Sequence, residues 1–314
     1  MGRKAGVRML DHGGGVDAAA ARFGGDRAGW LDLSTGINPV AYPLPDLPAW
    51  CWNTLPDRAA AERLTGAARR FWGVTEAAAV LAAPGASALI ARIPGLAAAG
   101  AVSIPGPTYN EHAAAFTAAG WRLGEGTARV VVHPNNPDGQ FREVQPGGLL
   151  IIDESFCDVA PERSLIGLAD QPGVIVLKSF GKFWGLAGVR LGFAMGDPGL
   201  ISRLAEMLGP WPVSGPALVI GAAALTDQVW AMATRARLVA DAARLDGLMT
   251  GRGAALVGGT TLFRLYDVAE ATAWQDRLAR AQIWTRVFPY NRRWLRLGLP
   301  GTAAGWAQLE AALA

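Results

Sequence analysis

Cysteine, histidine and lysine are all scarce in this chain of 314 residues. Its two cysteines, Cys51 and Cys157, are too few for a disulfide framework or a cysteine-based metal site. Its three histidines are far apart in the sequence, so a metal site lacks its usual ligands and we expect no metal. Of the 29 lysine and arginine residues only three are lysine. Two of those three, Lys178 and Lys182, nevertheless occur four residues apart in one glycine-rich segment, which suggests a use for one of them.

Long apolar runs are also missing, and this excludes further classes of protein. No stretch reaches the roughly 18 charge-free residues of a membrane span, because Pro84, Gly85, Arg92 and Pro94 interrupt the alanine-rich stretch 79–104. The N-terminus leads into charged and glycine-rich sequence without an apolar signal core, so we expect a cytoplasmic protein. The net charge is only +3 and the arginines are scattered, so we expect neither nucleic acid nor a membrane as a partner.

The first two thirds of the chain alternate short apolar runs with amphipathic or alanine-rich stretches. This alternation predicts an α/β fold, in which a mostly parallel central sheet is covered by helices on both faces. The predicted strands are Val80–Ala82, Ala101–Ile104, Val130–Val132, Leu149–Asp153, Val174–Leu177 and Leu191–Ala194. The predicted helices are Ala59–Phe71, Ser87–Ala99, Glu111–Ala119 and Pro198–Leu208.

The last third has the pattern of a smaller α+β domain. Residues 217–250 form a long alanine- and leucine-rich segment between Pro216 and Gly251, which predicts one or two helices. We therefore expect three parts: an N-terminal arm over 1–40 that belongs in part to the small domain, a large domain over 41–210, and a small domain over 211–314. The elements predicted after residue 250 are strands at Thr261–Tyr266, Trp284–Phe288 and Trp294–Leu297 and helices at Ala269–Ala281 and Ala303–Leu313.

Lys182 stands between a serine three residues before it, Ser179, and an arginine eight residues after it, Arg190. A lysine amine is the protein nucleophile that forms Schiff bases with carbonyl compounds. A nearby hydroxyl and guanidinium, with glycines that allow close approach of the backbone, suit a phosphate group. The alternative is a surface lysine in a glycine-rich loop.

Further polar residues follow predicted strands, where open α/β sheets bind ligands. Asp153 closes an apolar run, and a buried carboxylate there needs a partner. That partner is either the protonated ring nitrogen of a cofactor or a helix cap or ion pair within the protein. Asn136 lies in the segment His133–Gly139, which is either a plain turn or a source of an amide donor for a cofactor oxygen.

Other candidates carry weaker signals. The residues Gly85, Ala86 and Ser87 precede a predicted helix, where backbone N–H groups suit a phosphate but an ordinary N-cap would look the same. Tyr109 either packs in the core or forms an aromatic plate against a flat cofactor. Arg296, in an apolar strand, either binds a ligand carboxylate through two of its N–H groups or makes a structural ion pair.

Taken together, in this order and spacing, these elements resemble the fold-type I pyridoxal phosphate (PLP) enzymes of the aspartate aminotransferase superfamily, over residues 30 to 314. The resemblance implies the PLP-transferase fold and a homodimer. It implies that Lys182 forms a Schiff base with PLP, that Asp153 pairs with the pyridine nitrogen, and that Tyr109 stacks on the ring. The implied cofactor contacts also include Gly85, Ala86, Ser87, Ser179 and Arg190 at the phosphate and Asn136 at the phenolate oxygen, with Arg296 at the substrate carboxylate.

Two positions depart from the family pattern. The family often has a tyrosine three residues after the aspartate that pairs with the pyridine, and this chain has Phe156. A second tyrosine often precedes the Pro-Asp of a loop that reaches the neighbouring subunit's cofactor phosphate, and this chain has Leu55. The first change removes one hydrogen bond to the cofactor oxygen, and the second puts the contact between subunits in question.

Within the superfamily, the chain resembles most the histidinol-phosphate aminotransferases and the threonine-phosphate decarboxylases of cobalamin synthesis. Three segments favour the decarboxylases: His12–Gly15, Asp32–Pro39 and Trp284–Gly301. The resemblance implies decarboxylation of O-phospho-L-threonine to 1-aminopropan-2-ol phosphate. The residues expected at this small phosphorylated amino acid are His12, Ser34, Thr35, Gly36, Asn136, Arg286 and Arg296. The alternatives are an aminotransferase for a phosphorylated or aromatic amino acid, and an inactive scaffold with the same fold.

Overall fold

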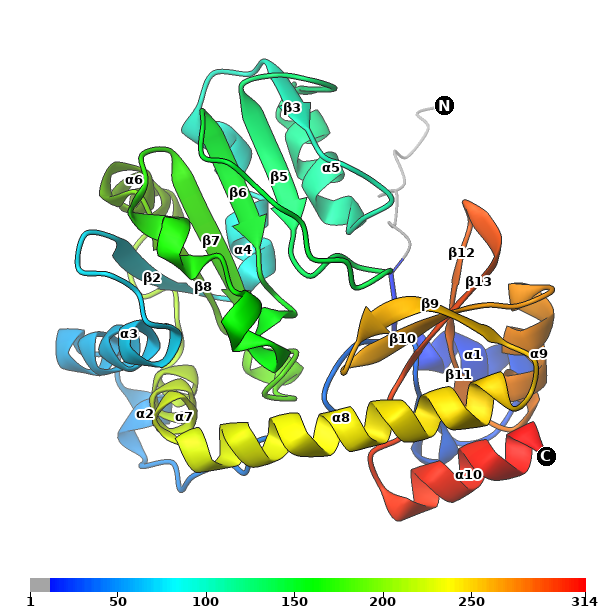
Figure 1. Ribbon diagram of the computed structural model, residues 1–314. Coiled ribbons are helices and arrows are strands. Elements are labelled where there is room, and N and C mark those ends of the chain that lie inside the picture. The colour runs from blue at the N-terminus through cyan, green and yellow to red at the C-terminus, as the bar shows by residue number, and fades with distance from the viewer. Residues whose placement is uncertain (1–11) are drawn as a thin grey trace, which may run out of the picture.

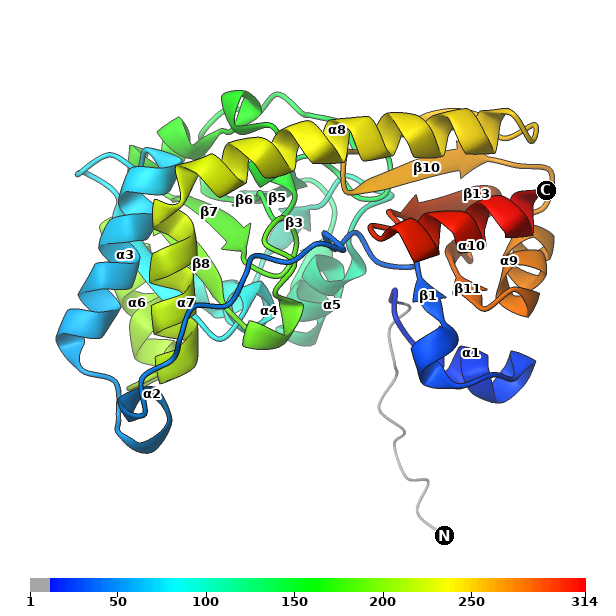
Figure 2. The ribbon, with the colours of Figure 1, turned by 90° about the horizontal axis from the view of Figure 1, so that it is seen from below.

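Two sheets of unequal size organise residues 12–314, the part of the chain that the computed structural model describes (Figure 1). The seven-stranded sheet lies on one side and the four-stranded sheet on the other. A single long helix, α8 (Gln228–Thr250), runs along both of them in the two perpendicular views (Figures 1 and 2). The first eleven residues of the expected N-terminal arm lie outside the described residues.

The large sheet has the strand order β2-β8-β7-β6-β5-β3-β4. The strands from β7 to β4 pair in parallel, and β8 is antiparallel to both of its neighbours. The expected mostly parallel α/β sheet is therefore confirmed. The one strand of this sheet that was not predicted is β4 (Arg122–Leu123), whose two exposed residues give no apolar signal. The others are β2 (Ala79–Ala83), β3 (Ala101–Ser103), β5 (Ala128–Val132), β6 (Leu149–Asp153), β7 (Val174–Ser179) and β8 (Gly192–Gly196).

Both faces of this sheet are buried, because successive side chains of a strand point to opposite faces. Leu150 and Ile152 of β6 belong to a core that includes residues of α3 (Arg58–Trp72) and α7 (Gly215–Thr226). Ile151, between them, belongs to a second core with residues of α4, α5 and α6. The latter three helices are Ala86–Ile90, Asn110–Ala118 and Pro198–Leu208. The short helix α2 (Trp50–Asn53) packs against α7.

The helix predicted over 87–99 is wrong in length. It ends at Ile90 and is followed by a separate 3-10 turn, Ile93–Leu96. Proline has no backbone N–H and clashes with the preceding turn, so Pro94 stops the α-helix. The segment 217–250, for which one or two helices were expected, forms the two helices α7 and α8.

The break between these two helices lies at Asp227. Its side chain accepts a hydrogen bond of 2.9 Å from the backbone N–H of Trp230, which caps α8. Among residues 12–314 no single helix is long and apolar enough to cross a membrane. Together α7 and α8 meet the length and composition, but they are bent by 77° at their junction.

The small sheet has the order β12-β13-β10-β9 and is antiparallel throughout. Its strands are β9 (Ala255–Thr260), β10 (Phe263–Asp267), β12 (Arg286–Phe288) and β13 (Asn291–Gly298), and α9 (Ala271–Arg280) and α10 (Ala303–Leu313) accompany it. The strand predicted over 284–288 is two strands, because β11 (Ile283–Trp284) leaves this sheet to pair in parallel with β1 (Leu31–Asp32). Helix α1 (Val16–Phe23) shares a small core with Ala279 of α9. The domain boundaries at residues 40 and 210 remain predictions.

Candidate active site

Two adjoining cavities of about 150 and 500 Å³ lie where the large sheet meets the small one. Their shared walls are Tyr109, Asn136, Phe156 and Lys182. The smaller cavity is lined by all the residues expected at the cofactor, namely Gly85, Ala86, Ser87, Tyr109, Asn136, Asp153, Ser179, Lys182 and Arg190. The larger one is lined by six of the seven expected at the substrate, namely His12, Thr35, Gly36, Asn136, Arg286 and Arg296.

Asp153 ends β6 and is almost completely buried. One carboxylate oxygen accepts hydrogen bonds from the N–H of Ser155 at 2.9 Å and from its hydroxyl at 2.5 Å. The other oxygen lies 2.8 Å from Nε2 of His112 on α5. Burial by itself would raise the pKa of Asp153, but the hydrogen bond and charge of His112 and the bonds from Ser155 bring it below its usual range. Asp153 is therefore held as a carboxylate.

A close-packed cradle forms around Gly85, Arg190 and Ser87. Both Gly85 and Arg190 have left-handed backbone conformations, with φ of 87° and 54°. The guanidinium of Arg190 donates a 3.0 Å hydrogen bond to the Ser87 hydroxyl, and a Cβ on Gly85 would lie only 2.6 Å from that guanidinium. The backbone of 85–87, a hydroxyl and a guanidinium therefore line one end of the cavity. This donor set fits a phosphate group.

Lys182 lies between this cradle and the small sheet. Burial and the positive charges of Arg296 and Arg190 lower the pKa of Lys182 to about 8, although the carboxylate of Asp153 opposes them. Its amine lies 5.4 Å from the ring centre of Phe156, which packs edge-on against Phe263 at 5.0 Å. Phe156 thus forms an apolar wall at the position where the family often has a tyrosine hydroxyl.

Lys178, four residues earlier, is part of the protein core instead. Its ammonium lies 2.6 Å from Glu154 and 3.5 Å from Asp158. The oxygen of Asp158 that faces Lys178 also accepts a 2.8 Å hydrogen bond from the indole of Trp72. Burial would lower the pKa of Lys178, but the two carboxylates raise it above its usual value. Lys178 is therefore a charged structural residue, unsuited to act as a nucleophile.

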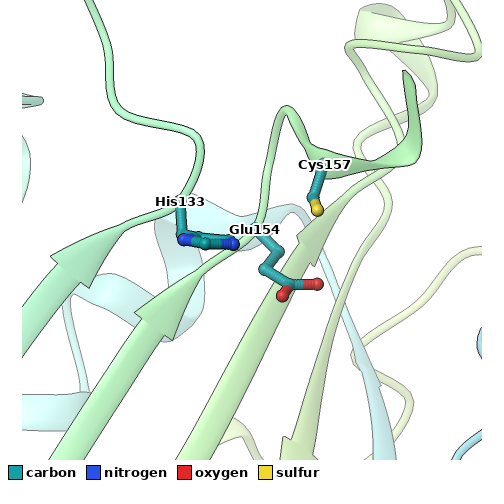
Figure 3. A group of neighbouring side chains, drawn as sticks. All are labelled: His133, Glu154 and Cys157. Carbon is teal, nitrogen blue, oxygen red and sulfur yellow. The ribbon is translucent and has the colours of Figure 1, made fainter. Parts of the chain in front are cut away.

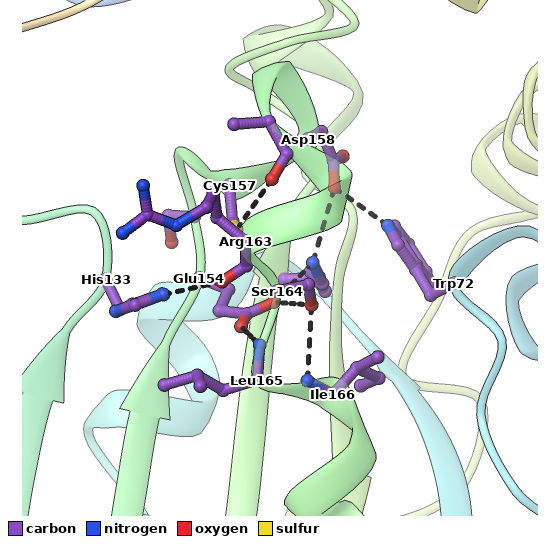
Figure 4. A network of polar contacts seen from close by, with 12 residues as sticks. Trp72, His133, Glu154, Cys157, Asp158, Arg163, Ser164, Leu165 and Ile166 are labelled. Atoms are coloured by element: carbon purple, nitrogen blue, oxygen red, sulfur yellow. Dashed lines mark hydrogen bonds and ion pairs between the residues drawn. The ribbon is translucent and has the colours of Figure 1, made fainter. Parts of the chain in front are cut away.

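The side chains of His133, Glu154 and Cys157 lie within 4.8 Å of one another and could suggest a metal site (Figure 3). Their atoms already have other partners, as Figure 4 shows. His133 accepts from the N–H of Arg142 at 3.1 Å through Nδ1, and its Nε2 donates to the carbonyl of Arg163 at 2.8 Å. The two oxygens of Glu154 accept from the loop at 164–165 and from Lys178, and the Cys157 thiol donates to a loop carbonyl. The cluster therefore fastens the loop after β6 to the sheet.

Arg296 extends from β13 of the small sheet into the wall of the larger cavity. Its guanidinium donates to the side-chain oxygen of Asn136 and, at 2.7 Å, to the backbone carbonyl of Ser34. Burial and the charge of Arg286 lower the pKa of Arg296 to about 10. Its Nε has no hydrogen-bond partner among the described residues. A buried cation of this kind favours an anionic ligand, because an uncompensated buried charge is costly.

Of the remaining substrate candidates, Arg286 and His12 line the larger cavity and Ser34 does not. Arg286 lies directly across from Arg296 in the sheet and donates to the backbone carbonyl of His12 at 2.6 Å. The His12 imidazole lies 2.7 Å from Glu111 of α5, so it spans from the small sheet to the large domain. The side chain of Ser34 does not line either cavity: its hydroxyl donates to Asp32 and accepts from the N–H at residue 14. A role for that hydroxyl at the substrate remains an untested prediction.

His112 and Ser155 are site residues that the sequence did not indicate. His112 comes three residues after Tyr109, the N-cap residue of α5, and their ring centres lie 6.1 Å apart. That spacing is the one signal that could have connected His112 to the cavity. Its partner Asp153 is 41 residues away on another element, and a helical histidine has no pattern that marks such a partner.

The family model for class I and II aminotransferases matches residues 130–312 of this chain. The chain belongs to the class I and II aminotransferase family. It is 42% identical to the threonine-phosphate decarboxylase of Sinorhizobium sp., an alignment that covers 96% of this chain and 97% of that enzyme. The threonine-phosphate decarboxylase of Pseudomonas aeruginosa is 41% identical, with 97% of both chains covered. The solved histidinol-phosphate aminotransferase of Sinorhizobium meliloti, in complex with pyridoxal-5'-phosphate, superposes with a TM-score of 0.81 at 19% identity and covers 98% of this chain and 94% of its own.

The contrast between the two lysines of this aminotransferase-family chain can be tested with cofactor-free protein. We expect reductive alkylation with PLP to label Lys182. The rate should rise as the pH passes through 8 and then level off, because the free amine reacts and the pKa is about 8. Peptide mapping across the pH series is the measurement. Lys178 is the internal control, since its ion pairs keep it protonated, and labelling of Lys178 in place of Lys182 would contradict the assignment.

Proposed function

We propose that this chain is a PLP-dependent threonine-phosphate decarboxylase, which converts O-phospho-L-threonine to carbon dioxide and 1-aminopropan-2-ol phosphate, a precursor of the cobalamin side chain. The observation that carries this function is the identity of 42% and 41% to two threonine-phosphate decarboxylases over nearly the whole of each chain. The cavity chemistry supports it, because the described site offers separate cationic groups for two anions.

The residues around the smaller cavity fit PLP. The cradle of Gly85, Ser87 and Arg190, with Ala86 and Ser179, would hold its phosphate. Asp153 would hold its ring nitrogen, Asn136 its ring oxygen and Tyr109 its ring face, and Lys182 would bind it covalently. When bound, PLP supplies an electron sink for the electron pair that stays on Cα after the carboxylate leaves.

Two tasks in the smaller cavity then fall to the chain's own residues. His112 and Ser155 occupy the oxygens of Asp153 and hold it in place as a carboxylate, which would keep a positive charge on the ring nitrogen of bound PLP. Lys182 holds a proton at Nζ and delivers it to Cα, which replaces the lost carboxylate. A pKa of about 8 suits this transfer, because the amine exchanges its proton readily near neutral pH.

The substrate carries a carboxylate and a phosphate, and the small sheet offers two arginines side by side. We assign the carboxylate to Arg296, which is buried beside Lys182 and Asn136. We assign the phosphate to the more exposed Arg286, with His12 and Thr35 as further donors in the larger cavity. Holding both ends of the substrate sets which bond at Cα is broken, and this orientation distinguishes decarboxylation from transamination.

Product analysis tests the reaction directly. Purified protein loaded with PLP and supplied with O-phospho-L-threonine should release carbon dioxide in step with 1-aminopropan-2-ol phosphate. An aminotransferase would instead form the keto acid and the aminated cofactor, and would need a second keto acid to continue. Formation of keto acid without carbon dioxide would refute the decarboxylase, and absence of both products would favour an inactive scaffold.

The two arginines should respond differently to removal. Each charge-assisted contact is worth roughly 1.5–3 kcal/mol, so losing one should weaken binding about ten- to a hundredfold. Arg286→Ala should weaken phosphothreonine far more than unphosphorylated threonine, whereas Arg296→Ala should weaken both alike. Equilibrium dissociation constants for both ligands provide the measurement. Equal losses for the two ligands in Arg286→Ala would show that Arg286 does not contact the phosphate.

The expected homodimer is also part of this proposal. Three large apolar side chains near α2 and the start of α7 are exposed: Trp52 by 69%, Leu55 by 64% and Trp211 by 58%. Residues 51 and 215 touch through their backbones, so these side chains belong to one region of the surface. A cluster of this kind is typical of an interface, because monomers rarely expose large apolar patches. The cytoplasmic location also remains a prediction.

Sedimentation tests the interface. The wild type should sediment as a dimer, and Trp52→Glu should shift it toward monomer because a charge cannot be buried there without a partner. Leu123→Glu is the matched control, since Leu123 is 56% exposed on β4 at the far edge of the large sheet. A wild type that is monomeric and active at nanomolar concentration would contradict the dimer.

A further inference from the structure

The segment 135–139, which carries Asn136, is fastened firmly to the large domain. The Asn135 amide donates to the carbonyl of Pro107 at 3.1 Å and to the carboxylate of Asp138 at 2.8 Å. Its side-chain oxygen accepts a 2.6 Å hydrogen bond from Thr108. These bonds set the loop's shape from the large-domain side, and leave its other side facing the small sheet.

The small sheet contacts the same segment at two separate points. At one point Arg296 donates to the side-chain oxygen of Asn136. At the other, the N–H of Gly259 donates to the carbonyl of Asp138 at 2.8 Å. Because Arg296 occupies the Asn136 oxygen, the amide nitrogen of Asn136 is the group left to serve a ligand in the cavity.

Beside the second contact, one position on each segment has no room for a side chain. A Cβ on Gly258 would lie 2.3 Å from the Asp138 carbonyl oxygen, and a Cβ on Gly139 would lie 2.0 Å from the carbonyl oxygen of Gly259. Real Cβ atoms do not approach an oxygen so closely, so the backbones of β9 and the loop touch only because glycine stands at both. Strand β9 is an edge strand, and the loop covers part of its free edge.

The two contacts are linked through one row of the small sheet. Gly258 pairs with Leu265, and Leu265 pairs with Arg296. Neighbouring strands lie roughly 4.7–4.9 Å apart, so the distance from Gly258 to Arg296 is set by two strand spacings. Leu265 is fully buried between them. A shift of β9 relative to the loop would therefore move Arg296 relative to Asn136.

We propose that Gly139, Gly258 and Gly259 form an interdomain clamp that positions Asn136 and Arg296 against each other in the closed site. This inference rests on the proposed role of Asn136 at the cofactor. In it the glycines are positioning residues: they touch neither cofactor nor substrate, and they act by fixing how near the small sheet comes to the loop.

Gly258→Ala is the test variant. The backbone of Gly258 does not have the left-handed conformation, so alanine strains nothing within β9 and meets only the Asp138 carbonyl. To reach an ordinary contact, the two backbones must separate by about 1 Å. A displacement of this size in a catalytic constellation costs up to about a hundredfold. We expect kcat/KM to fall ten- to a hundredfold and PLP to bind several-fold more weakly in a fluorescence titration. Gly247→Ala, exposed on α8 with open space around it, is the matched control and should change neither value.

A double-mutant cycle separates positioning from general destabilisation. In an Asn136→Ala background, Gly258→Ala should have less than a threefold effect on PLP affinity, because the group that the clamp positions is gone. Equal fold-losses in both backgrounds would overturn the proposal. In the wild type, the Gly259 amide should exchange with deuterium slowly, and exchange at the rate of an open strand edge would also overturn it. The PLP affinities and the exchange rate of the Gly259 amide test the clamp even if phosphothreonine is not the substrate.

Discussion

Repulsion between neighbouring cations is the constraint on which the site depends. Lys182, Arg190, Arg286 and Arg296 all line the two cavities, and among the described lining residues Asp153 is the acidic one. Burial, together with this repulsion, lowers the pKa values of Lys182 and Arg296. A site with this excess of positive charge is stabilised by ligands that bring several negative charges. A cofactor phosphate together with a substrate carboxylate and phosphate meets that requirement, whereas an uncharged amino acid side chain would leave Arg286 without a ligand anion.

The two acidic residues at the end of β6 are neighbours in the sequence, but one lies in the cavity and the other in the protein core. Asp153 faces the cavity, and Glu154, the next residue, turns to Lys178 in the core. Lys178 lies on β7 with its side chain in the core, whereas Lys182, four residues later and beyond the end of that strand, lines both cavities. Breaking a buried ion pair by removing one partner costs about 3–5 kcal/mol, so the Lys178–Glu154 pair also explains why a second lysine is kept so near the reactive one.

The alternation of apolar runs was enough to predict the large sheet apart from β4, and the resemblance of the motifs to fold-type I PLP enzymes predicted the residues around the smaller cavity. Ser179, Lys182 and Arg190 belong to one continuous segment, so their order carries the information. His112, Ser155 and the contact between Gly139 and β9 were not predicted, because each depends on two elements that meet only after folding. Strand β9 has exposed residues and two glycines, and therefore no apolar alternation. The roles of the site residues remain predictions, although the fold that brings them together is confirmed.

The pairing of β1 with β11 has a consequence for synthesis of the chain. Residues 31–32 emerge from the ribosome long before their partners at 283–284. The strands of the large sheet lie between residues 79 and 196, so that sheet can assemble while translation continues. The early segment must wait unpaired beside it. The small sheet, and with it the larger cavity, is completed only after β13 has been made, so a chain that ends before Arg296 does not carry a finished site.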